Sequence, residues 1–178
     1  MTGVAAVVLA AGAASRFGAP KQNLLLPHVL ARVRAAGLTE IVVVVGAHEL
    51  ETDAPVLRCT DWERGPGASL RCGLAALSPA AEAAVVVLAD GPDLASAAIK
   101  RVIAAWRRER APLVAASYGG VRGHPLLLDR ASWPDVPDEG LRAREPLLVA
   151  CDTLGEPGDV DRPGDLPERF RRTPAEPM

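Results

Sequence analysis

The stretch VAAVVLAAGAASRFGAPKQ, residues 4–22, sets the expected fold. Its first part, residues 4–10, is a short apolar run rich in valine and alanine and free of charge, which predicts a buried strand. The chain then enters a loop that carries two glycines, two cations and a proline. Loops at the carboxyl end of a first strand are where open α/β sheets usually bind phosphorylated ligands. The stretch therefore predicts an α/β sheet with an anion-binding loop after its first strand.

Composition bounds the function. A chain of 178 residues suits one domain, and its 49% apolar and 24% charged residues are ordinary for a globular protein. Aromatic residues make up only 3%, which disfavours a base-stacking platform for single-stranded nucleic acid. The net charge of −2 gives no basic surface for DNA or RNA. We expect no nucleic-acid partner.

The cysteines and the apolar start of the chain bear on location. Cys59, Cys72 and Cys151 are widely spaced, odd in number and without a CxxC pair, so neither a zinc site nor a disulfide framework is predicted. Reduced thiols in a cytoplasmic protein are expected. Residues 4–14 resemble a signal peptide only superficially, because no Lys or Arg precedes them and Gly12 interrupts them. The segment is also too short to cross a bilayer, so no membrane association is expected.

Hydrophobic periodicity predicts an alternation of strands and helices. Strands are expected at residues 40–46, 55–58, 84–89, 112–116 and 125–128, and helices at residues 28–37, from about 69, and at 96–110. This order predicts an α/β fold with a mainly parallel sheet, to which a hairpin turning through residues 118–123 adds a late antiparallel strand.

The chain is expected to be a single domain over residues 1–166, with a disordered tail at 167–178. Beyond residue 151 the sequence is rich in glycine, proline and acidic residues, which predicts that this part buries no core.

Spacing excludes two common nucleotide loops. The dinucleotide fingerprint G-x-G-x-x-G is absent, because Gly12 is followed by two alanines. The P-loop pattern also fails, because Gly12 and Gly18 are one residue too far apart and an Ala-Pro pair precedes Lys21. A different anion site remains, in which backbone amides near Gly12, the guanidinium of Arg16 and the ammonium of Lys21 hold a triphosphate.

A carboxylate completes this hypothesis. Asp90 follows a predicted buried strand, so it lies at the same sheet edge as Gly12 and can hold Mg²⁺ that bridges phosphate oxygens. An equally good interpretation is an aspartate that accepts backbone hydrogen bonds in a turn ahead of the next helix. The residues alone leave both open.

Six segments, in order along the chain, resemble motifs of one family. LAAGAASRFGAPKQ (residues 9–22) resembles the signature loop L-A-[AG]-G-x-x-x-R-[MF]-G-x-x-K of the MobA-like NTP transferases. WERGPGASLRCGL (residues 62–74) resembles the W-x-x-G-x-x-x-S-L-R-x-G-L segment of their molybdenum cofactor cytidylyltransferase branch. The other four are LADGPDL (88–94), GVRGHPLLL (120–128), DEGLRA (138–143) and DVDRPGDL (159–166).

The resemblance implies a three-layer α/β/α fold of the nucleotide-diphospho-sugar transferase type, with a Rossmann-like sheet. It also implies an Mg²⁺-dependent nucleotidyltransferase, in which a phosphorylated acceptor attacks the α-phosphorus of an NTP and pyrophosphate leaves. Catalysis then rests on alignment and charge neutralisation.

The resemblance also implies roles for single residues. Arg16 and Lys21 would neutralise the leaving pyrophosphate. Asp90 would bind Mg²⁺, with Asp161 or Asp159 as a second ligand. The residues expected on the nucleotide side are Leu9, Ala10, Ala11, Gly12, Gly65, Gly67 and Ser69. Those expected to face the acceptor are Arg122, Gly123 and His124, although His124 also suits a turn before a proline.

Substrate choice follows from details of the motifs. The alanine pair before Gly12 and the Gly-His-Pro hairpin are closer to the cytidylyl branch, which favours CTP over GTP. The favoured acceptor is molybdopterin, which implies a role in molybdenum cofactor biosynthesis. A molybdoenzyme is then a possible maturation partner. Alternative acceptors are a sugar phosphate or phospholactate. Several residues of the family pattern are missing after Gln22. This gap motivates a further alternative, a nucleotide-binding cofactor carrier that does not catalyse.

Overall fold

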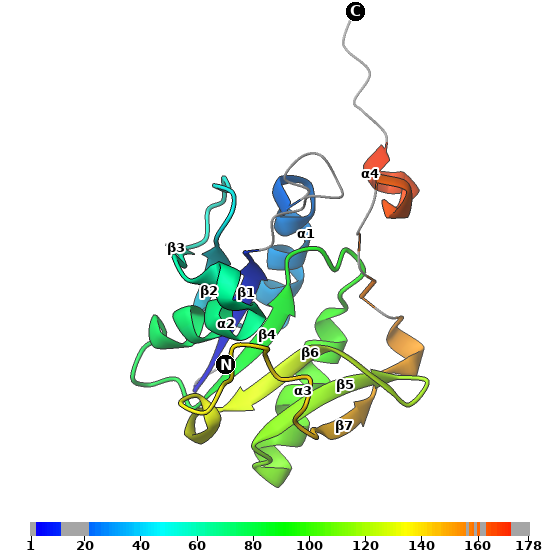
Figure 1. Cartoon of the computed structure of the whole chain (residues 1–178). Coiled ribbons are helices and arrows are strands. Elements are labelled where there is room, and N and C mark those ends of the chain that lie inside the picture. The colour runs from blue at the N-terminus through cyan, green and yellow to red at the C-terminus, as the bar shows by residue number, and fades with distance from the viewer. Residues whose placement is uncertain (1–2, 12–21, 156, 159, 161–162, 172–178) are drawn as a thin grey trace, which may run out of the picture.

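One mixed sheet organises the chain. The computed structural model describes residues 3–11, 22–155, 157–158, 160 and 163–171. In these residues, seven strands form a sheet in the order β3-β2-β1-β4-β6-β5-β7 (Figure 1). The strands are β1 (Val4–Ala10), β2 (Ile41–Val45), β3 (Val56–Arg58), β4 (Ala83–Leu88), β5 (Leu113–Tyr118), β6 (Val121–Asp129) and β7 (Leu147–Ala150). Strand β6 runs antiparallel to both its neighbours, and the other pairs are parallel. The predicted α/β class with a late antiparallel strand is confirmed.

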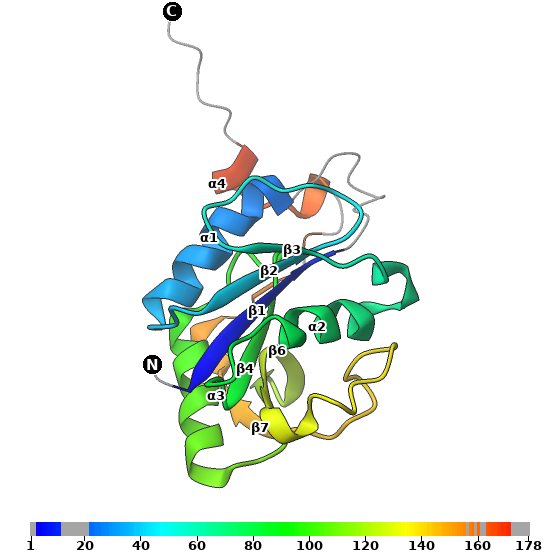
Figure 2. The same ribbon diagram turned by 90° about the vertical axis from the view of Figure 1, so that its left-hand side faces the viewer.

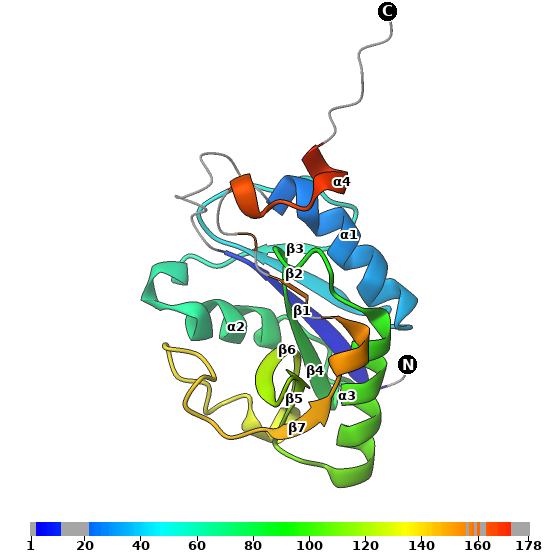
Figure 3. The same ribbon diagram turned by 90° about the vertical axis from the view of Figure 1, so that its right-hand side faces the viewer.

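Helices cover both faces of the sheet. Helices α1 (Gln22–Ala35) and α3 (Ser96–Glu109) lie on one face, and α2 (Pro66–Ala75) lies on the other (Figures 2 and 3). Alternate residues of β1 serve the two layers, since Ala6 and Val8 pack with α1 and α3 while Val7 packs with α2. This is the period of two expected of a strand that is buried on both sides. The three-layer α/β/α prediction is confirmed.

Helix α1 begins six residues before the predicted start at residue 28. Pro27 lies inside it and removes one backbone hydrogen bond, at a cost of about 3 kcal/mol in a helix interior. The earlier start buries Leu25 and Leu26 completely, and each such burial contributes about 1.5–3 kcal/mol. The two leucines therefore offset the proline. Helix α2 likewise begins at Pro66 and not near 69, because proline is well suited to a first helical position.

The chain beyond Cys151 does bury apolar side chains, so that prediction is wrong. Val160 and Leu166 pack with Leu25 of α1 in a small cluster. In the short helix α4 (Glu168–Arg171), Phe170 stands edge-on to His28 with ring centroids 4.6 Å apart. The sequence misleads here because a few apolar residues among prolines and glycines are enough when an existing helix supplies the other half of the cluster. The domain boundary at residue 166 stays a prediction, and residues 172–178 lie outside the described part.

The cysteine prediction also needs correction. Cys59, directly after β3, and Cys72, in α2, form a disulfide with their Cα atoms 5.9 Å apart. Cys151 is a free thiol, as predicted, and it is buried. A spacing of 13 residues carries no signal in the sequence, because the pairing depends on α2 lying beside the end of β3. None of the helices in the described residues has the length and apolar character needed to cross a membrane.

The disulfide closes a short loop and should stabilise the fold. Loops of about 15 residues gain on the order of 3 kcal/mol from such a bond in the chain-entropy account. We expect dithiothreitol to lower the urea midpoint of the wild type, and Cys72→Ser to lower it to the same value without reductant. The Cys72→Ser variant should no longer respond to dithiothreitol. An identical wild-type midpoint with and without reductant would rule the bond out.

Close packing of α2 on the sheet gives a second prediction. A Cβ added at Gly73 would lie 2.5 Å from Val7 Cγ1 and 2.8 Å from Val44 Cγ2. We expect Gly73→Ala to destabilise the protein by about 1–3 kcal/mol through overpacking, although alanine is the better helix former by about 1 kcal/mol. Urea unfolding measures the change. Ala75→Ser, on the exposed side of α2, is the matched control and should change stability by less than about 0.5 kcal/mol.

Candidate active site

Three parallel strands end at one edge of the sheet. Leu9 of β1 pairs with Val44 of β2 on one side and with Leu88 of β4 on the other. The segments that follow these strands therefore leave from the same edge, as the sequence predicts. Gly12, Arg16 and Lys21 belong to the first of these segments, and all three lie outside the described residues. Their predicted roles stay predictions.

The antiparallel strand β6 brings the predicted acceptor residues to this edge. Val86 of β4 pairs with Leu126 of β6, and beyond this last pair Leu88 and His124 line the same cavities. Asp90 follows Leu88 by two residues. The charge of Asp90 raises the pKa of His124, which places the two side chains within electrostatic reach of one another. The structure thus brings together two residues that the sequence separates by more than thirty positions.

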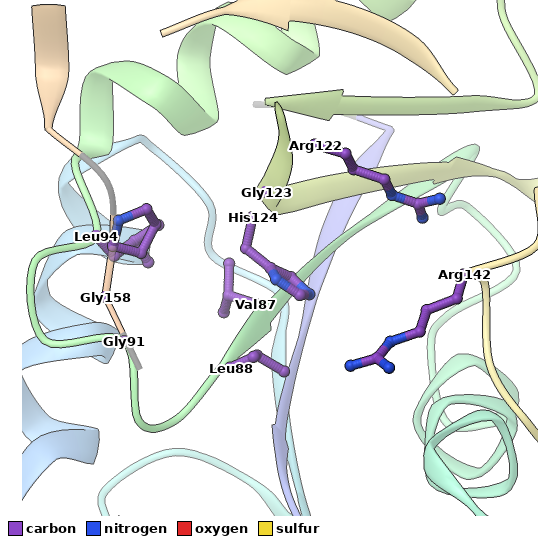
Figure 4. Close-up of a pocket in the computed structure, with 10 residues that line it drawn as sticks. Val87, Leu88, Gly91, Leu94, Arg122, Gly123, His124, Arg142 and Gly158 are labelled. Atoms are coloured by element: carbon purple, nitrogen blue, oxygen red, sulfur yellow. The ribbon is translucent and has the colours of Figure 1, made fainter. Parts of the chain in front are cut away.

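The same edge is hollowed by two adjoining cavities of about 660 and 550 Å³. Volumes of this size are typical of small-molecule sites. The first reaches Leu9, Pro66 and Leu70 towards α2, and the second reaches Gly91 and Leu94 beyond β4. Five residues line both cavities and stand between them: Leu88, Arg122, Gly123, His124 and Arg142 (Figure 4).

His124 is uncharged at neutral pH. Burial, followed by repulsion from Arg122, lowers its pKa to about 4, against a smaller opposing effect of Asp90. Its backbone oxygen accepts a hydrogen bond of 2.9 Å from the hydroxyl of Tyr118 across the hairpin. A neutral imidazole in the wall of the cleft can donate or accept one hydrogen bond to a ligand, but it adds no positive charge.

The guanidinium of Arg122 donates hydrogen bonds within the protein. Its Nη1 donates to the backbone oxygens of Leu141 at 3.0 Å and of Arg144 at 2.8 Å. Burial lowers the pKa of Arg122 from its ordinary value, although a guanidinium stays protonated at any physiological pH. The sequence predicts acceptor binding for this residue. The geometry adds that it fastens the segment 141–144 to β6.

Gly65 and Gly67, predicted on the nucleotide side, lie against the segment 136–140. A Cβ at Gly65 would lie 2.3 Å from the backbone oxygen of Asp138, and one at Gly67 would lie 1.7 Å from that of Pro137. Gly67 also donates its backbone N–H to Asp138 at 2.9 Å. Close approach of two backbones therefore explains both glycines. Their contact with a base or ribose stays a prediction.

Asp138 ties this segment to α2 by charge as well. Its carboxylate accepts hydrogen bonds from Arg71 and from Arg64, the latter at 2.9 Å, and these two arginines hold its pKa below the ordinary value. Arg71 also donates to the backbone oxygen of Val136 at 2.6 Å. The segment is thus held at the mouth of the cleft by Arg71 of α2 and by Arg64 in the turn before this helix.

The remaining nucleotide-side residues lie where the sequence expects them along the fold. Leu9 lines the larger cavity, Ala10 and Ala11 are buried at the end of β1, and Ser69 is buried in the first turns of α2. Their contact with a nucleotide stays a prediction. Gly123 and His124 line both cavities, on the side of the cleft away from α2.

A divalent metal would find only part of its ligand set in the described residues. No group of three His, Cys, Asp or Glu side chains gathers within them. Asp90 alone stands at the edge, half-buried, while Asp159 and Asp161 lie outside the described part of the chain. One carboxylate fits Mg²⁺ bound with a nucleotide, because this ion takes most of its ligands from phosphates and water.

Arg142 is a pocket residue that the sequence analysis does not single out. It lines both cavities, and its side chain extends from the 139–144 segment towards His124 and Leu88 (Figure 4). The DEGLRA motif contains it, two residues after Gly140. That motif is the one signal that could have found it.

Comparison with known proteins gives the family. The sequence matches the MobA-like NTP transferase domain over residues 6–146. The chain belongs to the MobA-like NTP transferase family. Membership supports nucleotidyl transfer from an NTP as the general activity, and it confirms the resemblance seen in the motifs. A search of curated protein sequences found no match.

Solved structures agree with the family. Rv0371c from Mycobacterium tuberculosis H37Rv is 30% identical with a TM-score of 0.75, and the match covers 92% of this chain and 95% of that one. A second structure of Rv0371c, in complex with manganese, is 28% identical with a TM-score of 0.64 and coverages of 84% and 88%. A nucleotidyl transferase from Methanothermobacter, Mth528, is 18% identical with a TM-score of 0.70 and coverages of 91% and 93%, which shows a shared fold.

The lowered pKa of His124 predicts a pH dependence of stability. Because its pKa is about 4 in the folded state and near 6.5 unfolded, unfolding takes up a proton between these values. The contribution of His124 to the free energy of unfolding is therefore highest above pH 6.5, where His124 is neutral in both states. It falls as the pH drops towards 4, because the unfolded state binds the proton more readily than the folded state. We expect the free energy of unfolding to drop by on the order of 1–3 kcal/mol more in the wild type than in His124→Gln between pH 7 and 4.5. Parallel pH profiles of the two proteins, measured by urea unfolding, would contradict this.

Proposed function

We propose that this protein transfers CMP from CTP to the terminal phosphate of an acceptor, with molybdopterin as the favoured acceptor, and releases pyrophosphate. An acceptor phosphate oxygen forms the new bond to the α-phosphorus, and the bond from that phosphorus to the β-phosphate oxygen breaks. Both electrons of the broken bond leave with pyrophosphate. No covalent bond to the protein is required.

One observation supports the proposal: two adjoining cavities share a wall at the end of β4, two residues before Asp90. On one side Leu9, Pro66 and Leu70 line a largely apolar cavity that suits a base and ribose. On the other side β6 presents Arg122 and His124 next to the end of β4. A nucleotide and a phosphorylated acceptor can therefore be held with their reacting groups at the same edge, which is how binding energy lowers such a barrier.

The proposed roles keep those that the sequence predicts. Arg16 and Lys21 neutralise the charge of the leaving pyrophosphate, as charge-stabilising groups do in phosphoryl transfer. Gly12 and the alanines before it, with Ser69, face the nucleotide. His124 and Gly123 form the acceptor wall of the cleft.

We propose Mg²⁺ as the metal, held by Asp90 and by Asp161 or Asp159. When bound, it would neutralise and orient the phosphate oxygens. Support for a divalent ion comes from the manganese complex of Rv0371c, a relative 28% identical to this chain. The carboxylate of Asp90 at the carboxyl end of β4 is an oxygen ligand of the kind that Mg²⁺ and Mn²⁺ accept.

Other substrates remain within the same chemistry. GTP in place of CTP, or a sugar phosphate or phospholactate in place of molybdopterin, would use the same edge of the sheet. A role in molybdoenzyme maturation follows only if molybdopterin is the acceptor. A non-catalytic nucleotide carrier is the alternative from another class, motivated by the shortened sequence after Gln22, where α1 begins at once.

We propose a cytoplasmic location, and the Cys59–Cys72 disulfide makes that proposal testable. Stable disulfides are rare in the reducing cytosol. Alkylation of free thiols in rapidly acidified cells, followed by mass spectrometry, measures the state of Cys59 and Cys72. A fully oxidised pair in living cells would speak against the cytoplasm.

Substitution of Asp90 tests the catalytic proposal. We expect the wild type to release pyrophosphate from CTP in the presence of Mg²⁺ and a phosphorylated acceptor, and Asp90→Asn to lower kcat by at least 100-fold, because the metal loses its protein carboxylate. Asp53→Asn is the matched control. Asp53 pairs with Arg34 at the exposed surface, at 2.8 Å, so its loss should leave turnover unchanged.

The possible outcomes separate the alternatives. Turnover with GTP or with another phosphorylated acceptor, still abolished by Asp90→Asn, would keep the chemistry and change the substrate. Nucleotide binding by calorimetry without pyrophosphate release, across a panel of acceptors, would favour the carrier. Full activity in Asp90→Asn would sink the metal role.

A further inference from the structure

We propose that Arg142 binds the phosphate of the acceptor, held over the cleft by a segment that α2 and β6 fasten from opposite sides. The inference deepens the proposed function and rests on it. It assigns a specificity-determining cation to the acceptor side, and it predicts that the acceptor is selected as a phosphate monoester.

The position of Arg142 is the first argument. It lines both cavities together with Arg122 and His124, and Figure 4 shows its guanidinium reaching from the segment towards the end of β4. The smaller cavity extends from there to Gly91, directly after the proposed metal ligand. A phosphate bound by Arg142 in the smaller cavity would therefore lie near Gly91, away from the larger apolar cavity beside α2.

The charge of the smaller cavity is the second argument. Its described lining residues include two arginines and one histidine but no carboxylate. Glu139 lines only the larger cavity, on the side of α2. A lining that carries two guanidinium groups favours an anionic ligand, and the effect is stronger where water is partly excluded.

Elimination among the three basic groups points to Arg142. His124 is neutral, because burial lowers its pKa to about 4. Arg122 already donates to two backbone oxygens of the segment 141–144. Within the part of the chain that the structure describes, Arg142 makes no hydrogen bond or ion pair, so no described residue occupies its five N–H donors.

The segment that carries Arg142 is held on both flanks. Ahead of it, Asp138 binds Arg64 and Arg71 of the α2 side, and its backbone oxygen accepts from Gly67. On either side of it, the backbone oxygens of Leu141 and Arg144 accept from Arg122 of β6. An arginine whose backbone is fixed in this way loses less freedom when it binds a ligand, which favours affinity.

The chemistry of the group fits a phosphate monoester. A guanidinium donates two parallel hydrogen bonds to two oxygens of one phosphate, a geometry that lysine cannot reproduce. A terminal phosphate held by this fork keeps its third oxygen available for attack. Arg142 is on this account a substrate-binding residue, and Arg122, beside its predicted place at the acceptor, positions the backbone on either side of Arg142.

Binding without turnover tests the inference. The wild type and its variants are saturated with Mg²⁺ and a CTP analogue that carries a methylene bridge between the α- and β-phosphorus, and glycerol 3-phosphate is then titrated by calorimetry. We expect Arg142→Gln to weaken glycerol 3-phosphate binding at least tenfold and Arg142→Lys to weaken it less. Affinity for the CTP analogue should be unchanged in both. Arg108→Gln, on the exposed side of α3, is the matched control and should bind as the wild type does.

The outcomes distinguish this inference from the proposed function. Loss of affinity for the CTP analogue in Arg142→Gln would assign Arg142 to the triphosphate and overturn the inference, while leaving nucleotidyl transfer intact. Equal glycerol 3-phosphate binding in wild type and Arg142→Gln, or none in the wild type, would also overturn it. Arg142-dependent binding of glycerol 3-phosphate by a wild type that binds no nucleotide would uphold the inference and end the proposed function.

Discussion

The reversal of β6 between β4 and β5 is the constraint on which the site depends. Had β6 continued the parallel pattern, its first residues would lie at the opposite edge of the sheet from Asp90. Because Leu126 pairs with Val86 in an antiparallel register, Arg122 and His124 instead extend past the end of β4. The hairpin turn through Gly119 and Gly120, both with positive φ, makes this reversal possible in two residues. One change of direction therefore gives the sheet edge at which three parallel strands end a second wall, and so makes it a cleft.

The segment at the mouth of the cleft, residues 136–140, is held in place by close backbone packing and by hydrogen bonds. Gly67 and Gly65 let the backbone of residues 137–138 approach α2 so closely that no Cβ would fit. Asp138 then adds hydrogen bonds from Arg64 and Arg71. Arg64 is exposed and the Arg71–Asp138 pair is half-buried, and pairs near the surface contribute little to stability on average. Their effect is on geometry, because they fix where the next residues of the chain stand relative to β6.

How much the sequence predicts depends on how local the signal is. Strands β2 and β4 are unbroken apolar runs, so they and the α/β class follow from the residues alone. The start of α1 does not, because Pro27 is a strong local signal and the burial of Leu25 is a tertiary one. The Cys59–Cys72 bond and the closeness of Asp90 to His124 are invisible for the same reason. Arg142 could not be predicted as a site residue, because a single arginine in a loop belongs to no periodic pattern. Only the fold shows that it lines a cavity.

The small cluster of Leu25, Val160 and Leu166 joins the start of α1 to the C-terminal segment. Leu25 stands in the first turn of α1, directly after the segment with the signature loop, and Val160 lies within the closing DVDRPGDL motif. These are two ends of the family pattern, 135 positions apart in the chain. Both are fully buried in one contact, at 0% and 1% exposure. The early start of α1 and the burial of the C-terminal segment are therefore linked, because the returning chain covers Leu25 in the first turn of the helix. The helix that contains Pro27 supplies an apolar side chain, Leu25, for the C-terminal segment to pack against. The C-terminal segment in turn buries Leu25, which offsets the cost of the proline in the helix.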